Sequence, residues 1–369
     1  MRYTVLAIAV VVMMLAGTTN VAAAADCAKT STGLPPLPDL GAGTYKSVQG
    51  GLYPGGANTP PAGYAAEGRR AAAEIVPRSA SGQPDPSGKI VLLSIGMSNT
   101  TQEFSQFVRL AQSDAVRDTD VVVVDGAQGG QDARVWADPK QRAWVEAEAR
   151  LTQAGVTAAQ VQAVWLKQAI ARPSGDFAAS SVLLEAALVK IVENAKARYP
   201  SLAQVFLSPR TYAGYATTTL NPEPYAYESA WAVKRLVERS VREPAARPWL
   251  DWGPYLWTDG AKGRADGFTW TCADAAPDGT HPSASGQAKV AQLLQTFFNS
   301  SGFTSWYRDT PAAVPSAATV APGAATAAAQ AGAPASAGVP EIAPWVYAVA
   351  ALAIGGAAAV MLRLTRRPR

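Results

Sequence analysis

Histidine and cysteine are the scarcest reactive residues of this 369-residue chain. It has one histidine, His281, and two cysteines, Cys27 and Cys272. A zinc site usually draws four ligands from these residue types and from carboxylates, so we expect no metal site. The Walker motif and the Rossmann glycine fingerprint, which bind nucleotide phosphates, are absent from the expected strand–helix junctions. We therefore expect a function that needs no cofactor.

Charge is also sparse, because only 16% of the residues are charged and the net charge is +4. Part of this excess comes from arginines at the end of the chain, and acidic and basic residues are otherwise interspersed. No basic stripe is present, which argues against nucleic acid as a partner. The sequence has no internal repeat, and we expect a monomer.

Both ends of the chain carry apolar runs with flanking charges. Residues 1–25 open with Arg2, continue with an apolar stretch and close in an alanine cluster. This order is typical of a secretory signal peptide. Residues 343–363 form a second apolar run, long enough to cross a bilayer, and residues 364–369 are rich in arginine. We expect the domain to be exported and held by a C-terminal transmembrane helix, with a basic cytoplasmic tail.

Two alternatives for the C-terminal run stay open. It could be a buried core helix, although core helices seldom end in an arginine cluster. It could also be a sorting tail that is cleaved, in which case the mature protein would lack the anchor. Residues 309–342 before it are rich in alanine, proline and threonine and cannot bury enough apolar area to fold, so we expect a linker there.

Between these ends the composition predicts one globular domain with a preceding extension. Residues 26–85 are rich in glycine, proline, alanine and serine, which predicts an irregular segment that is either wrapped on the domain or partly mobile. Residues 86–308 have the periodic pattern of a folded domain. An exported protein can retain a disulfide, so we predict a bond between Cys27 and Cys272. Two unpaired thiols are the alternative, because the sequence gives no distance between them.

Short apolar runs alternate with amphipathic stretches in the domain. This alternation predicts an α/β domain with a parallel sheet and functional residues at the strand ends. Residues 100–115 are expected to begin in a capping box formed by Thr100 and Glu103. A helix beginning near Thr157 fits one of the strand segments almost as well. The expected strands are 89–95, 121–124, 161–166 and 205–207, and the expected helices are 100–115, 181–198 and 283–298.

The single histidine lies in a polar turn before the last helix. Histidine is the side chain best suited to take a proton near neutral pH. Asp278 precedes His281 by three residues, a spacing that lets its carboxylate hold one ring nitrogen while the other points outward. A surface histidine would be the ordinary interpretation of this residue alone. The catalytic interpretation depends on a nucleophile elsewhere.

A serine directly after the first expected strand supplies that nucleophile. Ser98 lies in the segment 96–99, Gly-Met-Ser-Asn, beside the start of the next helix. Backbone N–H groups and the helix dipole there favour a developing oxyanion. The segment lacks the Gly-x-Ser-x-Gly elbow of α/β-hydrolases, because Thr100 stands at the last position. A helix-capping serine is the alternative.

Taken in order, these segments resemble the SGNH (GDSL-type) hydrolase family. Residues 96–98 stand where the family has Gly-Asp-Ser, with Met97 at the Asp position, and Asp278 and His281 match its closing block. The resemblance covers about residues 88–300. It implies a three-layer, flavodoxin-like α/β/α sandwich and ester hydrolysis through an acyl-enzyme, with the oxyanion bound by the N–H groups of Ser98 and Gly130.

The family's third block is the point of departure, because residues 164–172 contain no asparagine. The resemblance therefore leaves its oxyanion donor to Gln168 or Asn99, whose amides could donate equivalent hydrogen bonds. Arg210 and Tyr212 follow a later strand, where we expect them to contact a polar substrate.

These residues predict a membrane-anchored serine esterase acting on O-acyl, for instance acetyl, esters of carbohydrates or small molecules. Acyl transfer to a sugar stays open within the same chemistry. A catalytically weak SGNH-fold protein that binds glycans is the competing hypothesis.

Overall fold

The computed structural model describes residues 24–243 and 248–309. The predicted signal peptide, most of the linker, the C-terminal apolar run and the basic tail lie outside these residues. No helix within the described residues combines the length and apolar character needed to cross a bilayer.

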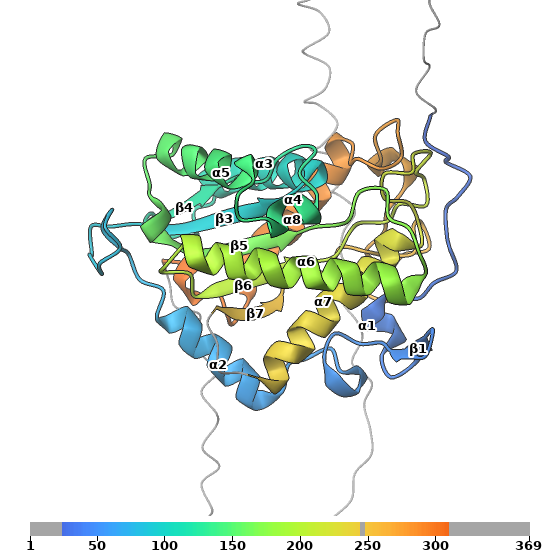
Figure 1. Cartoon of the computed structure of the whole chain (residues 1–369), viewed down its shortest axis with the longest axis horizontal. Helices are drawn as coiled ribbons and strands as arrows, with labels where there is room; N and C mark the ends of the chain where they lie inside the picture. Colours follow the sequence, from blue (N-terminus) through green and yellow to red (C-terminus); the bar gives the residue numbers. More distant parts are fainter. Residues whose placement is uncertain (1–23, 244–247, 310–369) are drawn as a thin grey trace, which may run out of the picture. The chain divides into compact units, whose positions relative to one another are not determined.

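A five-stranded parallel sheet forms the centre of the domain (Figure 1). Its strand order is β4-β3-β5-β6-β7. The first strand, β3, is second from one edge, β4 is added at that edge, and β5, β6 and β7 are added in turn on the other side of β3. This is the flavodoxin-like order, in which ligands bind where the direction reverses, at the carboxyl ends of the strands. The strands are β3 (Ile90–Gly96), β4 (Val121–Val124), β5 (Val161–Lys167), β6 (Gln204–Ser208) and β7 (Trp249–Trp252).

Helices cover the sheet in two groups. In one group α3 packs on α8; in the other α6 packs on α4 and α7, and α6 crosses in front of the strands in Figure 1. Because crossovers between parallel strands are right-handed, the reversal of direction after β4 places the groups on opposite faces. This is the predicted three-layer sandwich. The helices are α3 (Ser98–Gln112), α4 (Ala133–Ala137), α5 (Arg142–Gln153), α6 (Phe177–Arg198), α7 (Tyr225–Arg242) and α8 (Ala284–Ser300).

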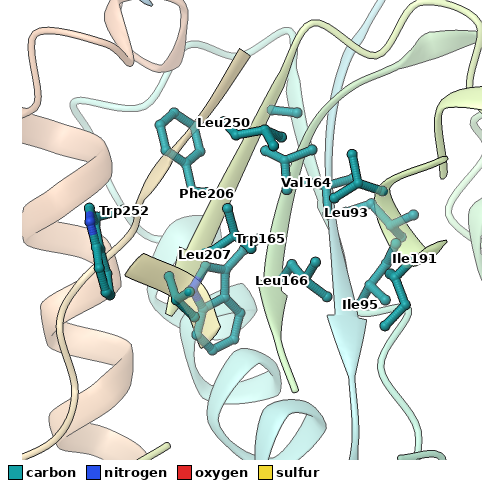
Figure 2. Packing of buried hydrophobic residues seen from close by; sticks show 14 of the residues in the cluster. Leu93, Ile95, Val164, Trp165, Leu166, Ile191, Phe206, Leu207, Leu250 and Trp252 are labelled. Atoms are coloured by element: carbon teal, nitrogen blue, oxygen red, sulfur yellow. The ribbon is translucent and has the colours of Figure 1, made fainter. Parts of the chain in front are cut away.

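The sheet is apolar on both faces, as expected for strands covered by helices on both sides. Residues at the same level of neighbouring strands share a face, which builds rows of apolar side chains across the sheet. One such row runs through Ile95, Leu166, Leu207 and Trp252, all shown in Figure 2. All four side chains are buried, so the row holds four strands together below the sheet's carboxyl edge.

The expected strands and three expected helices are present, with shifted ends. The largest shift is in α6, which begins at Phe177 rather than Ser181. The helix α3 begins at Ser98 rather than Thr100. The predicted capping box is therefore wrong. The Thr100 hydroxyl donates to the Lys167 carbonyl, and Glu103 is paired with the Lys167 ammonium. Gly96 permits the early start, because a Cβ there would lie 2.3 Å from the Thr100 hydroxyl.

The N-terminal extension is more regular than predicted. It contains α2 (Ala62–Ala73), an alanine-rich helix whose buried face includes Ala71 and Ala72. Tyr64 on this helix donates a hydrogen bond to the Leu250 carbonyl in β7, which ties the extension to the edge of the sheet. Shorter elements precede it, namely α1 (Leu37–Leu40), β1 (Thr44–Tyr45), β2 (Val48–Gln49) and η1 (Pro54–Gly56).

The remaining turns of 3₁₀ helix are η2 (Ala158–Gln160), η3 (Cys272–Asp274) and η4 (Ser305–Tyr307). The first of these ends where β5 begins, so the alternative of a long helix from Thr157 is excluded.

Candidate active site

Ser98 and His281, 183 residues apart in the chain, meet at the carboxyl edge of the sheet. The Ser98 hydroxyl lies 2.8 Å from Nε2 of His281. The other ring nitrogen, Nδ1, lies 2.6 Å from the Asp278 carboxylate. Ser98 is the first residue of α3, directly after β3, whereas Asp278 and His281 come from the loop before α8. The three side chains form a hydroxyl–imidazole–carboxylate chain of the kind that activates a serine.

The Asp278 carboxylate is held by its own loop. Its second oxygen accepts hydrogen bonds from the backbone N–H groups of Thr280 and His281, both at 3.0 Å. Burial opposes ionisation of this carboxyl, but the hydrogen bonds from the His281 N–H, the His281 ring and the Thr280 N–H outweigh it, so the pKa of Asp278 is lowered. The turn requires Gly279, which has a φ of +65° and no room for a Cβ against the Tyr215 carbonyl.

A pocket of about 370 Å³ opens beside these side chains. It lies at the point where the strand order reverses, because its walls come from the loops after β3, β4, β5 and β6 and from the His281 loop. Its lining residues are Met97, Ser98, Asn99, Gly130, Asp132, Ala169, Ile170, Ala171, Arg172, Arg210, Leu220, Asn221, Thr280 and His281.

Two backbone N–H groups at this pocket are available to a ligand. Ser98 begins α3, so its N–H has no partner within the helix. Gly130 lines the pocket from the loop after β4, with a φ of +74°. Within residues 24–243 and 248–309, neither N–H has a hydrogen-bond acceptor. Such donors next to a nucleophile can bind the oxyanion of a tetrahedral intermediate.

The two side-chain amides expected at the oxyanion have other partners. Asn99 donates from Nδ2 to the Thr280 carbonyl at 2.8 Å and thus joins α3 to the His281 loop. Gln168 does not line the pocket, and its Nε2 donates to the Gln131 carbonyl at 3.2 Å. The expectation for Gln168 is therefore wrong. The strand β5 ends at Lys167, the residue before Gln168, and the Gln168 amide binds the residue after Gly130 instead of facing the pocket.

Arg210 lines the pocket, as expected, whereas Tyr212 does not. The Tyr212 hydroxyl donates to the Lys29 carbonyl at 2.7 Å, and its ring packs edge-on against Tyr215. The N-terminal extension therefore accepts the hydrogen bond of this tyrosine's hydroxyl through Lys29. Substrate contact at Tyr212 is thus excluded in this arrangement, and its role is to hold the extension.

A disulfide links Cys27 to Cys272, the pair expected from the sequence. Cys272 lies in η3, and the next residue but one, Asp274, is paired with Lys289 of α8 at 2.6 Å. The backbone N–H of Ala276 also donates to the His281 carbonyl at 2.8 Å. The loop that carries Asp278 and His281 is therefore fastened at its start to the extension and to α8.

Three contributors to the site were not found from the sequence. Asn221 lines the pocket and accepts a hydrogen bond from Arg210, and the buried pair of Glu103 and Lys167 lies below Ser98 between α3 and β5. Glu103 lies five residues after Ser98 in the sequence, and Lys167 directly follows the expected strand 161–166. A charged residue inside each apolar pattern was the available signal.

No protein-family model and no curated protein matches the chain. Solved structures do match, with low identity. An acetylxylan esterase from Geobacillus stearothermophilus is 19% identical, with 60% of this chain and 97% of that chain covered and a TM-score of 0.37. A Bacteroides fragilis protein assigned as an acylhydrolase is 16% identical, with coverages of 64% and 94% and a TM-score of 0.34.

A salicylyl-acyltransferase from a tetracycline biosynthetic pathway is 17% identical, with a TM-score of 0.32. The match covers 58% of this chain and 56% of that one. The three solved structures are thus described as an acetylxylan esterase, an acylhydrolase and an acyltransferase, each at a TM-score below 0.5.

Proposed function

We propose that this protein is a serine ester hydrolase that works through an acyl-enzyme. The observation that carries the proposal is the continuous chain from the Ser98 hydroxyl through the His281 ring to the Asp278 carboxylate, at 2.8 and 2.6 Å, beside a pocket. A base within hydrogen-bond reach of a hydroxyl, itself oriented by a third group, is the arrangement that nucleophilic catalysis needs.

The proposed reaction begins with attack of the Ser98 oxygen on the ester carbonyl carbon. Nε2 of His281 takes the hydroxyl proton, and the Asp278 carboxylate stabilises the resulting imidazolium. The carbonyl oxygen becomes an oxyanion, which the N–H groups of Ser98 and Gly130 bind. The intermediate then collapses, and the alcohol leaves with the proton from His281. Water, deprotonated by His281, releases the acid and regenerates Ser98.

The proposed substrates are acyl esters, such as acetyl esters, of carbohydrates or small molecules. The pocket volume is within the usual range for small-molecule sites and suits a short acyl group with part of a sugar ring. We further propose that the protein is exported, anchored by its C-terminal apolar run and monomeric. The Cys27–Cys272 disulfide supports export, because such bonds persist in oxidising compartments.

Covalent labelling with a fluorophosphonate tests the nucleophile directly. The wild-type protein should be labelled once, and Ser98→Ala and His281→Ala should not be labelled. Ser113→Ala is the matched control, because Ser113 is an exposed serine at the end of the same helix and should leave labelling unchanged. Labelling that persists in Ser98→Ala would contradict the assignment.

The alternative of a glycan-binding protein without turnover has one observation in its favour, since Asn99 and Gln168 both use their amides elsewhere. A folded wild-type protein that binds acetylated oligosaccharides, is not labelled and releases no acetate would establish this alternative.

A further inference from the structure

Arg210 holds its positive charge in the interior beside the proposed nucleophile. Its side chain is 1% exposed and lines the pocket. Nε donates to the Asn221 side-chain oxygen at 3.2 Å, and Nη2 donates to the Thr280 carbonyl at 3.3 Å. Both acceptors are neutral. The third nitrogen, Nη1, is buried and has no partner within the described residues.

No carboxylate among the described residues forms an ion pair with Arg210. The acids whose charges act on it, Glu103, Glu223 and Asp278, are all engaged elsewhere. Asp278 binds the His281 ring. Glu103 binds the Lys167 ammonium. Glu223 accepts hydrogen bonds from the Trp257 ring and from the backbone N–H groups of Ala213 and Tyr227. A buried charge without a direct counter-charge is costly, which is the reason why such groups are normally paired.

The other charged groups at the pocket leave it positive. Asp132 is neutralised by Arg134, whose Nη2 lies 2.6 Å from its carboxylate. Arg172 lies exposed at the rim, has a left-handed backbone with a φ of +49°, and forms no ion pair within residues 24–243 and 248–309. The pocket thus has one arginine inside, one at its mouth and no free carboxylate facing them. Its apolar lining, such as Ile170 and Leu220, suits the carbon skeleton of a ligand.

We propose that the ester substrate carries a carboxylate, and that this carboxylate binds the Arg210 guanidinium inside the pocket while Arg172 attracts it at the mouth. This proposal rests on the proposed function, because it specifies which esters the Ser98 site accepts. The carboxylate belongs either to the acyl group, as in the half-ester of a dicarboxylic acid, or to the alcohol, as in an acetylated uronic acid. Both present the same group to Arg210, and separate substrates distinguish them.

The test compares two pairs of esters that differ by one carboxylate. The acyl pair is 4-nitrophenyl hexanoate and the 4-nitrophenyl half-ester of adipic acid. The alcohol pair is acetylated methyl glucoside and acetylated methyl glucuronoside. The full-length wild-type protein should show a kcat/KM about 10- to 100-fold higher for the anionic member of one pair, the range expected for a charge-assisted hydrogen bond. Arg210→Gln should bring that ratio close to one.

The ratio separates recognition from positioning. Arg210 also holds the Thr280 carbonyl, so Arg210→Gln can slow both members of a pair, but damage to the serine–histidine pair cancels in the ratio. Arg172→Gln should lower the ratio partially through the KM of the anionic ester. Arg109→Gln is the control, because Arg109 is an exposed arginine on α3 outside the pocket, and the ratio should not change.

A binding measurement on the wild type needs neither a variant nor turnover. Adipate or methyl glucuronoside should bind in isothermal titration calorimetry and inhibit ester hydrolysis competitively. Adipamide and methyl glucoside should neither bind nor inhibit. Hydrolysis of the neutral esters with no anionic preference and no anion binding would overturn this inference and leave the esterase intact. Anion binding without hydrolysis of any ester would overturn the proposed function and leave the carboxylate site. Equal losses for both members of a pair in Arg210→Gln would assign that arginine to positioning alone.

Discussion

The amide nitrogen of Asn99 lies 2.8 Å from the carbonyl oxygen of Thr280. This hydrogen bond joins the residue after Ser98 to the residue before His281. The Asn99 side chain is 2% exposed, so water competes little for the bond. Because each partner is one residue from a member of the hydroxyl–imidazole pair, the bond sets the distance between α3 and the His281 loop.

We expect Asn99→Ala to lower kcat about tenfold with little change in KM, since a lost buried hydrogen bond costs about 1–2 kcal/mol. The rate of fluorophosphonate labelling should fall in parallel. Asn58→Ala is the control, because Asn58 donates to the Pro38 carbonyl at the same 2.8 Å but in the exposed part of the extension. A rise in KM with an unchanged kcat would instead place Asn99 in substrate binding.

Gly129 and Gly130 provide a matched pair for the proposed oxyanion donor. An added Cβ would meet nothing within 4 Å at either glycine, but only Gly130 has a positive φ, of +74°. Gly130→Ala should strain or move the backbone that aims its N–H, by about 1–2 kcal/mol, and lower kcat at least tenfold. Gly129→Ala should leave kcat unchanged. Equal kcat values for the two variants in a steady-state esterase assay would remove Gly130 from the oxyanion site.

Removing one partner of the buried Glu103–Lys167 pair should destabilise the fold more than replacing both partners. Both side chains are fully buried, and burial lowers the pKa of Lys167 to about 8 although Glu103 opposes this. Removing one partner leaves an uncompensated charge, so Glu103→Leu should lower the free energy of unfolding by about 3–5 kcal/mol.

The double variant Glu103→Leu, Lys167→Met should recover most of that loss, because two apolar side chains replace two charged groups that folding removes from water. Urea denaturation of the wild type, both single variants and the double variant measures this. Additive losses in the double variant would show that the two side chains contribute independently.

Asp251 in β7 should make the fold less stable as the pH rises from about 4 to 7. Burial raises its pKa from 3.8 to about 7, against the lowering effect of hydrogen bonds from the Tyr53 hydroxyl and the Trp252 N–H. Between these values the native state holds a proton that the unfolded chain has lost, so the unfolding free energy falls, by up to roughly 4 kcal/mol.

Asp251→Asn should remove this part of the pH dependence and raise the Tm at pH 8, since the amide oxygen can still accept from Tyr53. Melting curves at pH 5 and pH 8 measure the difference. Asp85→Asn, at a partly exposed loop carboxylate with a lowered pKa, is the control and should not raise the Tm at pH 8. If the Tm of Asp251→Asn changed between pH 5 and pH 8 by as much as that of the wild type, the raised pKa of Asp251 would be contradicted.

The sequence alone predicted the alternation of four strands with helices and selected Ser98, Asp278 and His281 as the candidate site. It did not predict β7 or the helices α4, α5 and α7. Apolar runs and amphipathic stretches are local patterns, and Asp278 reaches His281 through three residues of one turn. Alanine-rich α2 escaped prediction, because its helix is selected by packing against β7 rather than by a marked apolar stripe.

Only the tertiary structure decided what each polar side chain near the nucleophile does. Gln168 and Tyr212 follow strands that end at the correct edge, yet their amide and hydroxyl bind the Gln131 and Lys29 carbonyls. Arg210 follows one of the same strands and faces the pocket. The position of a residue along a strand decides which edge of the sheet it reaches. Its hydrogen-bond partner depends on which distant carbonyl the fold brings within hydrogen-bonding distance.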